Sequence, residues 1–221
     1  MNRLAWILVA AAACVAGCTP TYRVHVNTYS ELDGPLDRAA PIYIAVDPNS
    51  QNPILRRQIA SKIRDLLQGN GYNPVEKMEA AAYLLTFELG MDSERVLDYA
   101  PIYRPYGGYY GGGYYGGGFG WGLGYTTYMP YVETLYTHWL RMRLYTTGGT
   151  SGQPAGEPVR PLDRQTVWVG EAVVGTDSPE FREAVNYLLV GCLEYLGVDT
   201  EEWVTEKIKP DDPRILGITA E

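Results

Sequence analysis

The sequence predicts an α+β domain: a single mixed, mostly antiparallel sheet of about five strands with two or three helices packed on one face. Segments in which apolar and polar residues strictly alternate are typical of half-buried strands, and two other stretches repeat apolar residues at helical spacing. The chain has 221 residues, 46% hydrophobic and 20% charged, which suits one folded domain. A formal charge of −8 argues against a partner such as nucleic acid, which requires clustered Lys and Arg.

The first half of the chain predicts a strand, a helix and another strand. Residues 22–29 and 41–47 alternate as strands, and Asn52 can cap a helix over residues 54–68. A further strand covers residues 83–91, and if it pairs in parallel with the strand before the helix, the crossover is right-handed. The helix also carries basic residues, most simply a solvated face: Arg56, Arg57, Lys62 and Arg64.

The second half predicts two antiparallel strands followed by helices. Residues 132–146 form a long strand that pairs with residues 165–175. Its inward face carries Val132, Tyr136, His138, Leu140, Met142 and Leu144. Ser178 and Pro179 begin a helix that Gly197 ends, and Thr200 can cap a short third helix through Ile208. No element is predicted for the tail that follows.

The N-terminus predicts export and lipid attachment. One positive charge and a twelve-residue apolar stretch, too short to span a bilayer, are typical of a signal peptide, over residues 1–17. The residues Val-Ala-Gly-Cys that end at Cys18 resemble a bacterial lipobox, which implies acylation of Cys18, palmitate included. Thr19 then implies the periplasmic face of the outer membrane, because the retention signal for the inner membrane would be Asp. The alternative is ordinary cleavage that leaves a soluble protein with a free thiol.

Cysteine content predicts a domain without disulfides. Cys14 lies in the signal and Cys18 is the predicted lipid site, so residues 18–221 form one periplasmic domain that retains Cys192 as its single other cysteine. Cys192 lies on the apolar stripe of a predicted helix, where a buried small hydrophobe is favoured over a reactive thiol.

The most unusual segment covers residues 107–124, which contain eleven Gly and no charge. With Tyr-rich flanks it predicts a long loop at about residues 100–130 between two strands. One interpretation is a flexible hairpin extension, and the other is a recognition arm whose rings bind protein, sugar or lipid headgroups. Six rings are candidate partner-binding residues: Tyr109, Tyr110, Tyr114, Tyr115, Phe119 and Trp121. A G-x-G-x-x-G match in this segment is rejected as a dinucleotide site, because no helix-forming sequence follows it.

A second candidate binding surface is a row on the 132–146 strand, formed by Trp139, Arg141 and Arg143. It is either a docking patch or a solvated face whose charge is balanced by carboxylates, with Glu88, Glu133 and Glu171 available on predicted strands. The two histidines, His25 and His138, are expected on opposite sheet faces, so neither a metal site nor a catalytic triad is predicted. No cofactor motif appears either.

Three short stretches resemble a domain-of-unknown-function family of Gram-negative lipoproteins, numbered four-one-three-six. They are Gly-Tyr-Asn-Pro-Val at residues 71–75, Ala-Ala-Tyr-Leu-Leu-Thr-Phe at 81–87, and Val-Trp-Val-Gly-Glu-Ala at 167–172. The resemblance covers residues 22–176 and implies a small α+β fold and an envelope location. It supplies no catalytic residues.

The sequence therefore predicts a lipid-anchored, non-catalytic envelope protein that works by binding a protein partner, as an adaptor in an envelope assembly. An alternative is a structural lipoprotein that contacts peptidoglycan or exported polysaccharide through the Gly/Tyr-rich loop. An uncharacterised enzyme is the remaining alternative, and it would require a concave pocket with converging polar groups.

Overall fold

Alternating residues build the antiparallel part of the sheet. The computed structural model describes residues 21–47, 50–104, 125–147 and 165–219. In it β1 (Tyr22–Ser30) pairs antiparallel with β6 (Thr166–Thr176), and β6 pairs antiparallel with β5 (Tyr125–Thr146). Since β5 also pairs antiparallel with β4 (Tyr83–Arg104), four neighbouring strands are antiparallel, which confirms the β5–β6 pairing and the mostly antiparallel sheet.

The strand–helix–strand unit forms the parallel edge of the sheet. β2 (Pro41–Ile44) pairs in parallel with β4, and α2 (Pro53–Gly69) lies between them in sequence. Asn52 caps α2 through its side chain, which accepts a hydrogen bond from the Leu55 amide at 3.0 Å. The helix ends where Gly71 adopts a φ of 81°, a conformation that glycine takes without strain.

The described residues contain seven strands rather than about five, in the order β3-β2-β4-β5-β6-β1-β7. One added strand is β3 (Asn73–Val75), at the edge beside β2, in a stretch for which no strand was predicted. The other is β7 (Val204–Ile208), which corrects the predicted third helix: these residues pair with β1 and complete the other edge. A short 3-10 turn, η1 (Met78–Ala80), precedes β4.

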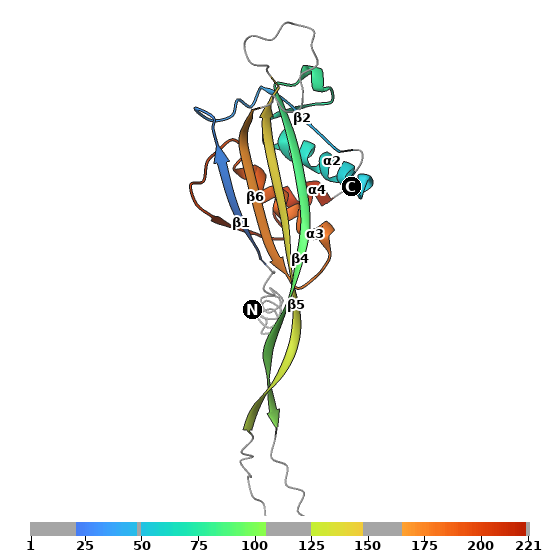
Figure 1. Cartoon of the computed structure of the whole chain (residues 1–221), viewed down its shortest axis with the longest axis vertical. Helices are drawn as coiled ribbons and strands as arrows, with labels where there is room; N and C mark the ends of the chain where they lie inside the picture. The colour runs from blue at the N-terminus through green and yellow to red at the C-terminus, as the bar shows by residue number, and fades with distance from the viewer. Residues whose placement is uncertain (1–20, 48–49, 105–124, 148–164, 220–221) are drawn as a thin grey trace, which may run out of the picture.

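Helices cover one face of this sheet, as predicted. In the view of Figure 1, α2, α3 (Phe181–Glu194) and α4 (Pro213–Thr219) all lie behind the strands. The N-cap of α3 is Glu180, two residues after Ser178. α3 is almost fully buried between the sheet and its neighbouring helices, and α4 is a helix in the tail for which no element was predicted.

The core contains a close contact between β6 and α3. Trp168 is 1% exposed and its ring folds back over Gly170, where an added Cβ would lie 2.4 Å from Trp168 Cη2 and 2.7 Å from Cys192 Sγ. The indole nitrogen donates to the carbonyl oxygens of Tyr195 and Val198. The Trp-x-Gly pattern therefore has a packing reason: only glycine leaves room for the ring.

β4 and β5 continue well past the rest of the sheet. Figure 1 shows them leaving it as a twisted two-stranded ribbon, here named the arm: residues 92–104 of β4 and 125–137 of β5. The Tyr-rich flanks expected in a loop are thus strand residues, paired from Arg104↔Tyr125 onward. Val132 corrects another expectation: it lies on the arm and is exposed, because no helix reaches that far along the strand.

Candidate functional site

The sheet face opposite the helices carries the predicted row of Trp139, Arg141 and Arg143. Side chains alternate along β5, so the residues between them, including Leu140 and Met142, point into the core. The three members of the row are half-buried against neighbouring strands. The structure therefore brings the predicted row together on one open surface, named here the open-face patch.

Two ion pairs fix the arginines of this patch. Arg141 Nε lies 2.7 Å from Glu171 Oε1 on β6, and Arg143 Nη1 lies 2.9 Å from Glu88 Oε1 on β4. These half-exposed pairs each contribute about 0–1 kcal/mol, so they orient the guanidinium groups more than they stabilise the fold. The expectation that strand carboxylates balance the arginines is confirmed for Glu88 and Glu171. It is wrong for Glu133, which lies on the arm opposite Val96.

Trp139 on β5 is paired directly opposite Gly90 on β4. A Cβ added at Gly90 would lie 2.3 Å from Trp139 Cζ2, so the indole occupies the space that a side chain would need. Beside the ring is a shallow hollow of about 100 Å³, lined by Trp139, Leu140, Arg141, Glu171, Ala172 and Val173. An aromatic ring next to a fixed arginine is a combination that protein interfaces favour.

The histidines lie on opposite faces, as expected. His25 is exposed and accepts or donates a hydrogen bond through Nδ1 with Thr205 Oγ1, whereas His138 is fully buried under α3. His138 Nε2 lies 3.1 Å from both Thr176 Oγ1 and the Ser178 carbonyl oxygen, and the ring packs against Phe181. His138 Nδ1 has no hydrogen-bond partner among the described residues. Its surroundings are those of a core residue.

Cys192 is confirmed as a buried residue of α3, 0% exposed. Burial, with a smaller contribution from the Glu171 carboxylate, raises the pKa of its thiol, which keeps the sulfur protonated.

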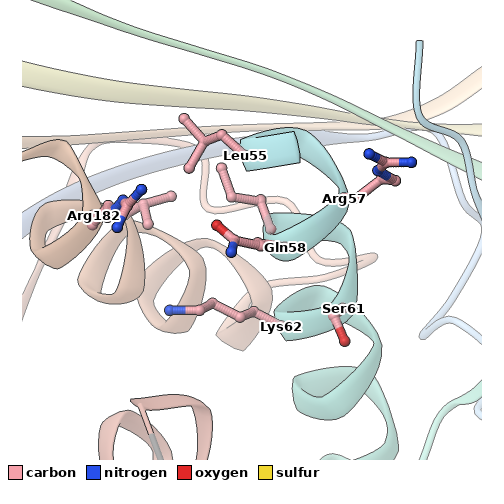
Figure 2. A pocket seen from close by; sticks show the side chains of 8 residues that line it. Leu55, Arg57, Gln58, Ser61, Lys62 and Arg182 are labelled. Carbon is pink, nitrogen blue, oxygen red and sulfur yellow. The ribbon is translucent and has the colours of Figure 1, made fainter. Parts of the chain in front are cut away.

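A basic cleft between α2 and α3 was not predicted. It has a volume of about 530 Å³. Figure 2 shows Gln58 and Lys62 extending from α2 toward α3, with Arg182 on the α3 side, while Arg57 and Ser61 point elsewhere. Lys62 Nζ donates to Asn186 Oδ1 at 2.7 Å, which ties the two helices together. The basic residues of α2 were visible in the sequence, but their position opposite Arg182 depends on how the helices pack.

Other predicted site residues lie outside the described part of the chain: Cys18, Tyr109, Tyr110, Tyr114, Tyr115, Phe119 and Trp121. Among the described residues, no helix is both long and apolar enough to cross a membrane. Within the same residues, no three His, Cys, Asp or Glu side chains are grouped as a metal ion would require.

No family model and no curated protein matches the chain, so the family resemblance stays a prediction. Among solved structures, a PDZ domain protein from Parabacteroides distasonis is 14% identical with a TM-score of 0.47. That match covers 92% of this chain and 42% of the other, so the chain spans less than half of that protein. Two structures of a PelC dodecamer from Paraburkholderia phytofirmans are also similar. The first is 12% identical with a TM-score of 0.41, and the match covers 79% of this chain and 98% of the PelC chain. The second is 11% identical with a TM-score of 0.42, and the match covers 80% of this chain and 99% of the PelC chain. Similarity this low carries no argument about what this chain binds.

Proposed function

We propose that the protein is a lipid-anchored, non-catalytic component of the cell envelope, attached through Cys18 to the outer membrane on its periplasmic side, where it binds a protein partner as an adaptor. The location rests on the signal and lipobox pattern that ends at Cys18. The binding role rests on one observation: the helix-free face of the sheet presents Trp139 beside an arginine already fixed by an ion pair.

The open-face patch suits a protein partner for a physical reason. Arg141 is held in place before binding, so docking a partner loses little side-chain entropy. The Trp139 ring packs against Gly90 and is only half-buried, so part of it remains accessible to a partner. A partner with an apolar side chain for the hollow and a carboxylate for the arginines would match this surface.

Crosslinked pull-down from native envelopes tests the proposal. We expect Trp139→Thr, which keeps a strand-forming residue, to weaken capture of a defined partner by a factor of about 30 or more, the cost of losing a central aromatic contact. Trp203→Thr is the matched control, because Trp203 is an exposed ring immediately before β7, at an edge of the sheet away from the open-face patch. Equal recovery of every partner with Trp139→Thr and with the unmodified protein would refute an adaptor role for this patch.

The alternative of a structural lipoprotein that contacts peptidoglycan or exported polysaccharide has its own support. The two strands that flank the Gly/Tyr-rich segment, ending at Arg104 and starting at Tyr125, project away from the sheet. Binding by that segment would be independent of the open-face patch. Co-sedimentation with cell-wall sacculi that disappears on deletion of residues 107–124, but persists in Trp139→Thr, would favour this alternative over the adaptor.

A further inference from the structure

The arm has no neighbouring strand along most of its length. The pairing of β4 with β2 ends at Leu85, and the pairing of β5 with β6 ends at the Tyr136↔Thr176 rung. Beyond that rung, the described residues of the arm form only a two-stranded ribbon. Such a ribbon is marginally stable in water unless something covers it.

The two sides of the arm differ in charge, because one side carries an exposed apolar cluster and no carboxylate. Leu97 lies opposite Val132, and Tyr99 and Tyr128 follow on the same side of the ribbon, because side chains alternate along strands and paired residues share a face. All four are strongly exposed, at 57%, 63%, 55% and 65%. They are named here the distal patch. An exposed apolar cluster of this kind marks an interaction site.

The acidic residues of the described arm all lie on the opposite side. They are Asp92, Glu94, Asp98 and Glu133. Asp98 accepts a hydrogen bond from the Tyr131 hydroxyl, and this contact raises the pKa of Tyr131. Arg95 is on the apolar side. This opposite side is mixed, because Met129, Tyr131 and Leu135 are also exposed there, whereas the side with the distal patch carries no carboxylate.

The start of β1 lies at the end of the sheet from which the arm emerges. Met91, His138, Val174 and Val24 form one row across four strands, and Tyr22 lies two residues farther toward the arm. Cys18 is four residues before Tyr22, so it reaches at most about 14 Å from it. Leu97 lies about 13 Å beyond the Tyr22 level, Tyr99 about 20 Å and the Tyr128 rung about 26 Å. The distal patch therefore begins at about the farthest level that Cys18 can reach along the arm and continues beyond it.

We propose that the distal patch inserts into the headgroup layer of the membrane that holds the lipid anchor, and that the arm is a second, non-covalent membrane contact. This inference rests on the proposed acylation of Cys18, because only that anchor brings a bilayer to this end of the molecule. Tyr rings favour the boundary between headgroups and acyl chains, and Leu97 and Val132 supply buried apolar area. The acidic side of the arm selects a zwitterionic surface over an anionic one.

Vesicle flotation tests the inference without the anchor. The chain beginning at Thr19 carries no acyl group and retains every described residue. We expect it to float with phosphatidylcholine vesicles, to bind less well when phosphatidylglycerol is added, and to keep binding zwitterionic vesicles at high salt. The triple variant L97T/Y128T/V132T keeps strand-forming residues, and we expect its partition to fall about tenfold or more, as loss of apolar insertion requires. The double variant I54T/Y29T is the control, since both residues are exposed and lie outside the arm.

Two outcomes would overturn the inference. The first is absence of flotation, or equal flotation of the triple variant and the unmodified chain. The second is a dimer in sedimentation equilibrium that the triple variant abolishes while neither chain floats, which would assign the distal patch to a second copy. Palmitate labelling of the full-length protein is measured separately, so failure of the Cys18 anchor is distinguishable from failure of the arm.

Discussion

Gly90 is the residue on which the open-face patch depends most directly. A methyl group there would overlap the Trp139 ring at 2.3 Å, so we expect Gly90→Ala to displace the indole and to lower the free energy of unfolding by about 1–3 kcal/mol. Tryptophan fluorescence and urea unfolding measure both effects. Gly175→Ala on β6 is the control, because an added Cβ there meets nothing within 4 Å and the free energy should stay the same or rise. An unchanged spectrum for Gly90→Ala would contradict the placement of the ring.

His138 combines a satisfied nitrogen with an unsatisfied one in a fully buried position. We expect His138→Ala to lower the free energy of unfolding by about 2–4 kcal/mol, because it leaves a cavity under α3. His138→Leu keeps the volume and removes the unpartnered Nδ1, so it should cost clearly less. Chemical denaturation compares the two. If both variants lost the same free energy of unfolding, the hydrogen bonds of Nε2, rather than packing, would account for the contribution of His138 to stability.

Cys192 should not react in the folded protein. Its burial and raised pKa leave almost no thiolate at pH 8, so we expect labelling by a thiol reagent to be at least about a hundredfold slower in the native chain beginning at Thr19 than in denaturant. That chain lacks Cys14 and Cys18, so the signal reports Cys192 alone. Rapid native labelling would show that α3 separates readily from β6.

At the scale of elements, the first turn of α4 is held by hydrogen bonds to Asp212, the residue that precedes the helix. Asp212 accepts hydrogen bonds from the Arg214 amide at 2.9 Å and from its guanidinium at 3.0 and 2.9 Å, and Arg214 also reaches Glu194 on α3. The side-chain hydrogen bond from Arg214, its largest cause, holds the pKa of Asp212 below its ordinary value. The ionised Asp212 side chain therefore stabilises the fold when the pH is above the pKa of Asp in the unfolded chain, about 3.9. This stabilisation is lost as the pH falls through the lower native pKa.

We therefore expect Asp212→Asn to be less stable than the unmodified protein at pH 7, by less than about 1 kcal/mol because the pair is part-exposed. The difference should begin to shrink below about pH 4, where the Asp212 carboxylate of the unfolded chain becomes protonated, and should disappear as the pH falls through the lower native pKa. Thermal unfolding between pH 3 and pH 7 measures it. Asp211→Asn, one residue earlier, is the control. A difference that stays constant with pH would show that charge is not what Asp212 contributes.

β7 shows where local pattern fails at the element scale. Val204 and Ile208 are four residues apart, which fits one face of a helix, yet with Glu206 they also fit one face of a strand. The edge of β1 favours the strand over the helix. Pairing at five positions gives hydrogen-bond partners to backbone groups of β1 that would otherwise lie on an open edge of the sheet. Glu206 then accepts a hydrogen bond from Tyr195, which raises the pKa of that phenol to about 12.

At the scale of the whole molecule, the domain and the arm should be separable. Replacing residues 93–136 with an Asn-Gly turn joins Asp92 to Thr137, which are paired in register, and removes no residue of the core. We expect the free energy of unfolding to change by less than about 1 kcal/mol, since the removed described side chains are largely exposed. Urea unfolding with circular dichroism measures this. A chain that fails to fold would mean that the arm takes part in forming the sheet.

The sequence by itself determined five of the seven described strands and two of the helices, because these depend on local features: alternation, helical spacing and caps such as Asn52. The lipid anchor at Cys18 stays a prediction from the residues that precede it. The sequence also placed Trp139, Arg141 and Arg143 on one face, since the period of a strand is fixed. Only the tertiary structure decided which carboxylates pair with those arginines, that Trp139 lies over Gly90, and that α2 and α3 enclose a cleft. Only the tertiary structure also showed that β4 and β5 extend beyond the strands on either side of them. These features join residues far apart in the chain, and their energies depend on register and packing that no local pattern contains.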